Sequence, residues 1–360
     1  MNVKNRIGII TWHYYPNFGS ALQAYALHTY INNRGGDAML INYVRGKKPT
    51  FYKLRLCLSH FDRLIPRFLS KKIHYRFLSF ERDFFKETRI VSTKQDLSLL
   101  TQDFDVFICG SDQIWAPNVF DETYMLSFVP SGKKKISYAA SIGLPTIPNE
   151  VKAIYKKLLS NFDAISVREQ QGQELLKKEF NIDSVVVLDP TLLITNDQWK
   201  RIAIYPTHPP KYILCYFLGK NKEHRLLAEQ FAKKLQLKII CLSRYSIDKR
   251  STFITDVDAG PREFIGYIQN AEYIITDSFH GLCFSINLNK DFYVVNRFSS
   301  SDPINQNSRI ENILRVLDLK SRLIESLPTN IESIDYDKVN KLLAENRMYS
   351  YQFLSEHIGL

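Results

Sequence analysis

The residues best suited to chemistry lie in the last third of the sequence, in the motif TDSFHG at 276–281. The apolar run before this motif predicts a strand, and the apolar segment after it predicts a helix whose first amides point at a bound anion. There His280 can donate a hydrogen bond to a phosphate or move a proton near neutral pH. Asp277, Ser278 and Gly281 are the expected binding partners. The alternative is a structural histidine whose hydrogen bonds are satisfied in the core.

A second polar motif, Gly110-Ser111-Asp112-Gln113, also follows an apolar run. A glycine followed by three polar residues is poor core material and suits the lining of a cleft. Asp112 can accept the proton of a substrate hydroxyl, with Gly110, Ser111 and Gln113 around it. Its side chain can instead cap the next helix or turn.

Arg168 stands at the end of another apolar run, in the segment Ser166-Val167-Arg168-Glu169. Its planar guanidinium suits a phosphate or a carboxylate. A buried ion pair, for example with Asp189 or Asp112, is the alternative.

The turn after the first apolar run holds His13, Asn17, Gly19 and Ser20. Asn17 and Gly19 stand where a phosphate or sugar can be held, because ligands of open α/β sheets bind at strand ends near helix N-termini. His13 is also at a strand end. Ser20 with Gln23 three residues later predicts a capping box that starts a helix. Asn17 and Gly19 can alternatively serve the turn alone.

Short apolar runs alternate with helix-period segments along the chain, and this alternation predicts a doubly wound α/β fold. The expected strands are Ile7–Thr11, Ala38–Tyr43, Val106–Cys109, Ile136–Ala140, Ala164–Val167 and Val185–Leu188, then Tyr212–Phe217, Lys238–Leu242, Tyr273–Thr276 and Phe292–Asn296. The proline-rich stretch 196–211 separates six strands from four, so we expect one lobe at 1–195 and another at 196–360. The segment 334–360 predicts a terminal helix that packs on the second lobe or crosses back to the first.

The segment 47–89 departs from this alternation, with twelve Lys and Arg against four acids and with Phe and Leu at helical spacing. A basic amphipathic segment of this kind can lie on an anionic membrane. The alternative is a helical hairpin that packs on the first lobe with a solvated basic face.

The chain of 360 residues has a formal net charge of +11 and a pI of about 9.2, which favours an anionic partner. Nucleic acid is one such partner, but the sequence holds no recognised nucleic-acid-binding module, so we expect none. The five cysteines never form C-x-x-C, and four lie in apolar stretches, which predicts reduced core thiols and a reducing compartment. The N-terminal residues contain no signal-type apolar region, so we expect no secretory leader, and no stretch of about 18 apolar residues predicts a membrane span.

Taken together, these motifs resemble the polysaccharide pyruvyl transferase family. The resemblance runs from the segments at 7–11 and 17–23, through 110–113 and 166–169, to 276–281. It implies a pair of Rossmann-like lobes of the glycosyltransferase-B type, with the active site in the cleft between them.

The resemblance further implies phosphoenolpyruvate as donor and a sugar hydroxyl pair as acceptor, giving a pyruvate ketal without a metal or redox cofactor. His280 is then the general acid or a phosphate ligand, and Asp112 or His13 the base. Some relatives carry an Arg where this chain has Ser278, so Arg168 or Arg309 would supply the charge. The acceptor is expected to be a lipid-linked oligosaccharide, and the protein cytoplasmic and peripheral at the inner face of the membrane.

Two rival functions of other classes fit parts of the sequence. A glycosyltransferase with a nucleotide-sugar donor would use the same fold and the same phosphate site. A non-catalytic protein that binds nucleic acid would account for the charge but leave the cleft motifs unexplained. An inactive relative retained for glycan assembly is a third alternative.

Overall fold

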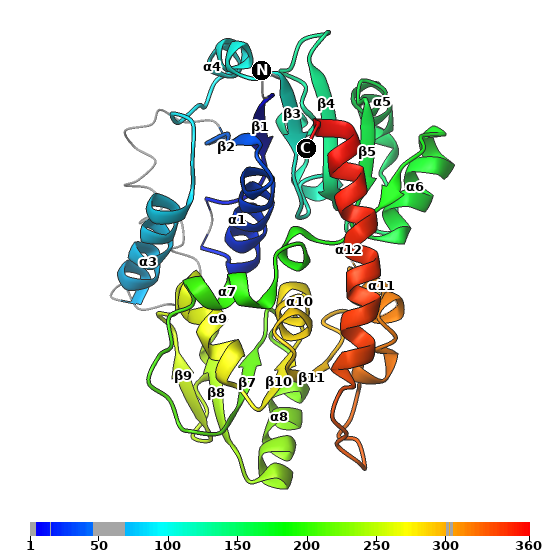
Figure 1. Ribbon diagram of the computed structural model, residues 1–360. Coiled ribbons are helices and arrows are strands. Elements are labelled where there is room, and N and C mark those ends of the chain that lie inside the picture. Colours follow the sequence, from blue (N-terminus) through cyan, green and yellow to red (C-terminus); the bar gives the residue numbers. More distant parts are fainter. Residues whose placement is uncertain (1–4, 15, 46–68, 300–301, 303–304) are drawn as a thin grey trace.

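The computed structural model describes residues 5–14, 16–45, 69–299, 302 and 305–360. Two parallel sheets, each covered by helices, lie one above the other (Figure 1). Cys57 and the part of the basic segment at 47–68 lie outside the described residues. Cys109, Cys215, Cys241 and Cys283 are buried and free, as predicted for reduced core thiols.

The first lobe contains a six-stranded sheet in the order β2-β1-β3-β4-β5-β6, and every pair of neighbours is parallel. Its strands are β1 Arg6–Ile10, β2 Asp37–Leu40, β3 Val106–Cys109, β4 Lys134–Ala140, β5 Ala164–Val167 and β6 Val185–Val186. The described helices on this sheet are α1 Phe18–Asn33, α3 Leu69–Phe84, α4 Lys94–Leu100, α5 Asn149–Leu159 and α6 Gln170–Phe180.

The second lobe contains a five-stranded parallel sheet in the order β11-β10-β7-β8-β9. Its strands are β7 Tyr212–Tyr216, β8 Lys238–Leu242, β9 Phe253–Asp256, β10 Tyr273–Thr276 and β11 Asp291–Val294. Its helices are α7 Asn196–Ile202, α8 Lys222–Leu235, α9 Pro261–Asn270, α10 Phe279–Asn287 and α11 Ser308–Val316.

The predicted count of four strands in the second half is wrong, because β9 was missed. This strand lies at the edge of the sheet, and only Phe253 of its four residues is buried. An edge strand with two exposed residues lacks the continuous apolar run by which buried parallel strands are recognised. The central strands β3 and β7 are buried along their whole length, and their positions were predicted correctly.

The helix α1 joins the two lobes through aromatic contacts. Phe18 stacks on Phe264 of α9 with ring centroids 4.6 Å apart, and Tyr25 contacts Trp199 of α7 at 5.5 Å. Trp199 in turn packs edge-on against Phe284 of α10. One apolar core therefore runs across both sheets, which fixes the loops of one lobe against those of the other.

The terminal helix α12, Tyr336–Ile358, spans both lobes (Figure 1). Near its start, the Tyr336 hydroxyl bonds to the carbonyl of Ser285 in α10. Further along, the Ser350 hydroxyl accepts from the Leu188 amide and the Tyr351 hydroxyl donates to the Leu193 carbonyl. The helix therefore packs on the second lobe and also crosses back to the first, the two alternatives predicted for it. It can do both because 23 helical residues reach about 35 Å.

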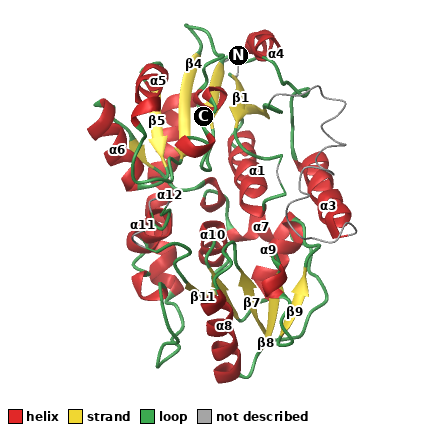
Figure 2. Cartoon of the chain, turned by 180° about the vertical axis from the view of Figure 1, so that it is seen from behind, coloured by secondary structure: helices red, strands yellow, loops and turns green. Residues whose placement is uncertain are grey.

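The described part of the basic segment forms α3 along one side of the molecule (Figure 2). Its Phe77 stacks on Phe18 with centroids 5.6 Å apart, and Phe80 packs against Tyr25. Arg76 pairs with Glu263 of α9 at 3.2 Å. The apolar face of this half of the segment therefore covers the core between the lobes. No described helix has the length and apolar character needed to cross a membrane.

Candidate active site

The strand order of each sheet reverses at one point, between β1 and β3 in the first lobe and between β7 and β10 in the second. Ligands of open α/β sheets bind at such switch points, beyond the carboxyl ends of the strands. The turn at 11–17 follows β1, the motif at 110–113 follows β3 and the motif at 276–281 begins at the end of β10. Three of the four sequence motifs thus occupy switch points.

Gly19 and His280 bring the two switch points into contact. A Cβ atom built on Gly19 would lie 2.0 Å from Nδ1 and 2.4 Å from Cγ of His280. No side chain fits in that space, so glycine at position 19 is what allows the imidazole of the second lobe to reach the start of α1.

The start of α1 differs from the predicted capping box. Asn17 is the cap residue, and its side-chain oxygen accepts from the amides of Gly19 at 2.9 Å and Ser20 at 3.4 Å. The Ser20 hydroxyl instead donates to the Asp112 carboxylate at 2.6 Å, and the side-chain amide of Gln23 donates to the Thr11 hydroxyl. Asparagine is as good a helix cap as serine. The Ser20 hydroxyl is therefore available to donate a charge-assisted hydrogen bond to the buried Asp112 carboxylate.

Asp189 is the carboxylate at the centre of this region. Its Oδ2 accepts from Arg168 Nη1 at 2.9 Å and from the Ser111 hydroxyl at 3.0 Å, while its Oδ1 accepts from the amide and hydroxyl of Thr191. Nε2 of His280 lies 3.6 Å from Oδ2. Burial alone would raise the pKa of Asp189, but His280 and Arg168 hold it well below the ordinary value. The site therefore contains a fixed negative charge beside a histidine.

Arg168 forms the predicted ion pair with Asp189 and keeps two nitrogens free. Its Nε and Nη2 atoms are buried and have no hydrogen-bond partner among the described residues, and Nε lies 3.8 Å from Glu169. The guanidinium lies over the Phe279 ring, 4.4 Å from its centroid. Buried donors without partners are costly, which points to an anionic ligand.

Arg309 approaches the other side of the same cluster, 5.8 Å from the Phe279 centroid. Its described hydrogen bonds go to the backbone and side-chain oxygens of Gln306, and Arg297 shares that side-chain oxygen. Burial lowers the pKa of Arg309, and repulsion from Arg168 and Arg297 lowers it further. In the described chain no carboxylate lies within ion-pairing distance of Arg309, so an anion bound here would be stabilised.

A cavity of about 140 Å³ lies beside these two arginines. Arg168, Asp189, Phe279 and Arg309 are among the residues that line it, and so is Asn312 of α11. No cluster of three or more His, Cys, Asp or Glu side chains able to hold a metal is present in the described residues.

Asp112 has an unusual backbone. Its φ of +77° lies in the left-handed region that non-glycine residues seldom adopt, and such residues gather at functional sites. The carboxylate accepts from Ser20 and from the amide of Gln113 at 2.9 Å. The side-chain nitrogen of Gln113 is buried and has no partner in the described chain.

The neighbouring strand supports this conformation. β4 has a bulge between Ser137 and Ala140, and the Ser166 hydroxyl donates to the Ser137 carbonyl and accepts from the Ala139 amide inside it. Bulges of this kind re-aim side chains next to active sites. The Ser166 side chain thus bonds to the backbone of the bulge, whereas Arg168, two residues later, bonds to Asp189.

Several predicted binding residues serve the turns themselves. Asp277 accepts from the amides of Leu218 and Gly219, at 2.6 and 2.8 Å. Ser278 caps α10 by accepting from the Gly281 amide. A Cβ on Gly110 would lie 2.9 Å from Thr11 Cβ. These residues hold the strand ends close together rather than offering free groups.

His13 is joined to a different group of residues. Its Nδ1 lies 3.0 Å from the Thr11 carbonyl and its Nε2 lies 3.0 Å from Glu87 Oε1. Burial by itself lowers the pKa of His13, but Glu87 and Glu81 outweigh burial and raise it. Burial also raises the pKa of Glu81, to about 7. The described contacts of His13 do not connect it with His280, Arg168 or Asp112.

The half-buried Glu81 predicts how the free energy of unfolding depends on pH. Its pKa is about 7 in the folded protein against an ordinary 4.5, so the folded state binds more protons between these values. The unfolding free energy contributed by Glu81 therefore falls as pH rises from about 4.5 to about 7. Relative to wild type, Glu81→Gln should gain about 1 kcal/mol between pH 5 and pH 7.5 in urea unfolding. The exposed Glu150→Gln should show no such change, and equal slopes for wild type and Glu81→Gln would contradict the assignment.

A family model described as polysaccharide pyruvyl transferase matches residues 17–300, a span that holds all the motifs above except His13 and Arg309. The chain belongs to the polysaccharide pyruvyl transferase family. No curated protein matches this family member by sequence.

Solved structures similar to this pyruvyl transferase family member share its fold at low identity. A putative UDP-N-acetylglucosamine 2-epimerase from Listeria monocytogenes has a TM-score of 0.51 and 11% identity, with 97% of each chain covered. UDP-GlcNAc 2-epimerase from Methanocaldococcus jannaschii has a TM-score of 0.51 and 13% identity, covering 95% of this chain and 92% of that one. Together with the two parallel sheets, these structures confirm the predicted fold of two Rossmann-like lobes of the glycosyltransferase-B type.

Sequence reasoning did not select Asp189, Phe279 or Glu169 as site residues in their own right. Asp189 was considered only as an ion-pair partner of Arg168, although it follows an apolar run and precedes a proline, as residues at strand ends do. Phe279 lies inside the motif at 276–281 and carries both arginines on its ring. Its position between Ser278 and His280 was the available signal.

Proposed function

We propose that this protein transfers the pyruvyl group of phosphoenolpyruvate to two hydroxyls of a sugar in a surface-polysaccharide precursor, forming a pyruvate ketal and releasing phosphate. Polysaccharide pyruvyl transfer is the activity for which the family is named. The observation that carries the choice of donor is Arg168, whose Nε and Nη2 are buried and unpartnered in the described chain.

The donor has two anionic groups, a carboxylate and a phosphate, and two arginines lie over one aromatic ring. Arg168 offers two free donors in a planar fork, which matches either group. Burial and repulsion from Arg168 lower the pKa of Arg309, which has no carboxylate partner in the described residues, so the second anionic group would stabilise its charge. The first amides of α10, from Gly281 onward, add a positive field.

Ketal formation moves protons in both directions. Protonation of carbon 3 of the donor generates cationic character at carbon 2, and the first sugar hydroxyl attacks there as it loses its proton. Departure of phosphate then lets the second hydroxyl attack the same carbon and lose its own proton. Two new C–O bonds, one new C–H bond and one O–H bond on phosphate replace the donor's C–O bond to phosphate, its π bond and two sugar O–H bonds. Of the two hydroxyl protons, one therefore balances the proton gained by carbon 3 and the other leaves with phosphate.

His280 is assigned as the acid that protonates carbon 3, or as the donor to the departing phosphate. Its Nε2 has no hydrogen-bond partner in the described chain and lies 3.6 Å from Oδ2 of the Asp189 carboxylate. Asp112 is assigned as the base, because both nitrogens of His13 already face Thr11 and Glu87. Asn17 and Gln113 are assigned to the sugar.

The acceptor is proposed to be lipid-linked and reached from the cytoplasmic face of the membrane. Lys71, Lys72, Arg82 and Lys86 are exposed, although α3 buries its Phe77 and Phe80. Each cation near an anionic leaflet contributes about 1 kcal/mol. Sedimentation with phosphatidylserine vesicles at physiological salt tests this part, and recovery of all the protein in the supernatant would refute it.

The experiment that tests the reaction combines purified protein, phosphoenolpyruvate and galactose-terminated lipid-linked oligosaccharides. A mass gain of one pyruvyl ketal with equimolar phosphate would support the proposal. In parallel, thermal stability is measured with phosphoenolpyruvate and with UDP-sugars, since a ligand that binds the native state raises the unfolding temperature. Stabilisation by a UDP-sugar alone, without phosphate release, would favour glycosyl transfer instead.

A further inference from the structure

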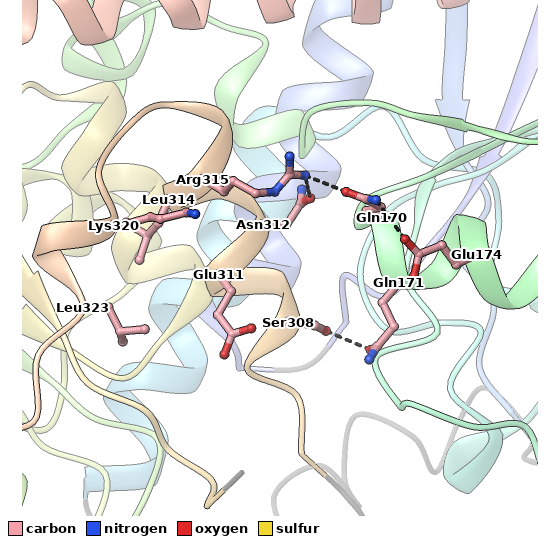
Figure 3. Close-up of a pocket in the computed structure, with 10 residues that line it drawn as sticks. All are labelled: Gln170, Gln171, Glu174, Ser308, Glu311, Asn312, Leu314, Arg315, Lys320 and Leu323. Carbon is pink, nitrogen blue, oxygen red and sulfur yellow. Dashed lines mark hydrogen bonds between the residues drawn. The ribbon is translucent and has the colours of Figure 1, made fainter.

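A cavity of about 510 Å³ lies between α6 of the first lobe and α11 of the second (Figure 3). This volume is within the range of about 300–1,000 Å³ that small-molecule sites occupy. The residues that line it are Gln170, Gln171, Glu174, Ser308, Glu311, Asn312, Leu314, Arg315, Lys320 and Leu323.

The lining is rich in groups that bind hydroxyls. Three amides, two carboxylates, a serine hydroxyl and two cations face the cavity, and the formal charges of its acids and bases balance. Amides and carboxylates both accept from hydroxyl groups, and amides and cations donate to them. A neutral, hydroxyl-rich ligand fits this lining better than phosphoenolpyruvate, which the arginines over Phe279 would attract.

The cavity adjoins the candidate active site through two chain segments and one shared residue. Gln170 follows Arg168 by two positions, and Ser308 immediately precedes Arg309. Asn312 lines both this cavity and the smaller one beside Arg168 and Asp189. A chain of sugar residues bound between α6 and α11 could therefore place its end at the arginines.

The cavity is also bridged from lobe to lobe. Ser308 donates to Gln171 at 2.9 Å, and Arg315 donates to Gln170 at 2.8 Å, as Figure 3 shows by dashed lines. Glu311 and Lys320 are exposed, and Figure 3 draws no hydrogen bond from either to the other residues shown. Their polar groups can therefore bond to a sugar hydroxyl without breaking a hydrogen bond drawn in the cavity.

We propose that the cavity between α6 and α11 is an acceptor subsite, which binds the neutral saccharide units next to the unit that is modified. That the bound saccharide is the acceptor rests on the proposed function. Saccharide binding itself rests on the cavity alone. Occupation of the subsite replaces the hydrogen bonds between the lobes by bonds through the sugar.

Two exposed positions test the subsite with little risk to folding. Glu311→Ala should raise the KM for a galactose-terminated lipid-linked oligosaccharide about tenfold, the loss expected for one hydrogen bond to a charged group. Lys320→Ala, at a second exposed position that lines this cavity and not the one beside Arg168, should have a similar effect. The KM for phosphoenolpyruvate should stay within twofold, and Glu345→Ala, an exposed glutamate on α12 outside the cavity, should change neither constant.

Direct binding separates this inference from the proposed reaction. The same oligosaccharide, freed of its lipid, is titrated calorimetrically into the protein without phosphoenolpyruvate. Weaker binding by Glu311→Ala would support the subsite even if no pyruvyl transfer occurs. Transfer by the wild type with an unchanged acceptor KM in both variants, or no saccharide binding by the wild type, would overturn the subsite.

Discussion

Replacing His280 by alanine should lower kcat for pyruvyl transfer by about 10²–10⁴-fold, the usual contribution of one positioned acid or base. Nε2 of His280 lies 3.6 Å from the buried Asp189 carboxylate and has no hydrogen bond in the described chain. Removal of the imidazole leaves Asp189 paired with Arg168 and Ser111, so the fold should survive.

The division of the loss between two constants identifies the role of His280. A fall in kcat with a nearly constant KM for phosphoenolpyruvate indicates proton transfer, whereas a rise in KM with a smaller fall in kcat indicates phosphate binding. His28→Ala, which removes another buried histidine from α1, is the control and should keep most of the activity. Near-full turnover by His280→Ala on the true acceptor would refute both roles.

Replacing Gly19 by alanine should reduce activity by about 100-fold, because the new methyl group must displace His280. The added Cβ would lie 2.0 Å from the ring, whereas real contacts begin above 3 Å. A displacement of about 1 Å at a catalytic group can cost roughly 10²-fold in rate. Because the contact joins the two lobes, the unfolding temperature should also fall.

Two further variants separate the steric effect from general damage. Gly172→Ala in α6 adds the same methyl group where the nearest atom is 3.6 Å away, so activity should be unchanged and stability slightly higher. The double variant Gly19→Ala/His280→Ala should recover thermal stability without recovering activity. Wild-type activity in Gly19→Ala would mean that the contact with His280 is not part of the working site.

Patterns along the chain determined the fold class and the positions of the motifs. Buried parallel strands such as β3 and β7 are continuous apolar runs, and a polar turn after each run indicates a strand end. These signals are local, so they survive without knowledge of which strands pair. The edge strand β9 carries the signal weakly, since half of its residues are exposed.

Only the tertiary structure decided which charged and polar groups meet. The sequence left both Asp189 and Asp112 as ion-pair partners for Arg168. The fold brings Arg168 to Asp189, 21 residues further along the chain. His13 follows a strand like the other candidates, but α3 and the isolated bridge between Glu87 and Leu40 bring Glu81 and Glu87 to its side. Gly19 and His280 are separated by most of the chain and touch across two lobes.

The sequence determines some of these features and not others because the interactions behind them act over different separations along the chain. Strand and helix patterns depend on backbone geometry and on burial within a few residues, which the sequence determines directly. Ion pairs, unpartnered donors and close glycine contacts depend on atoms brought together by the packing of α1 against α9 and α10, and no spacing in the sequence specifies that packing.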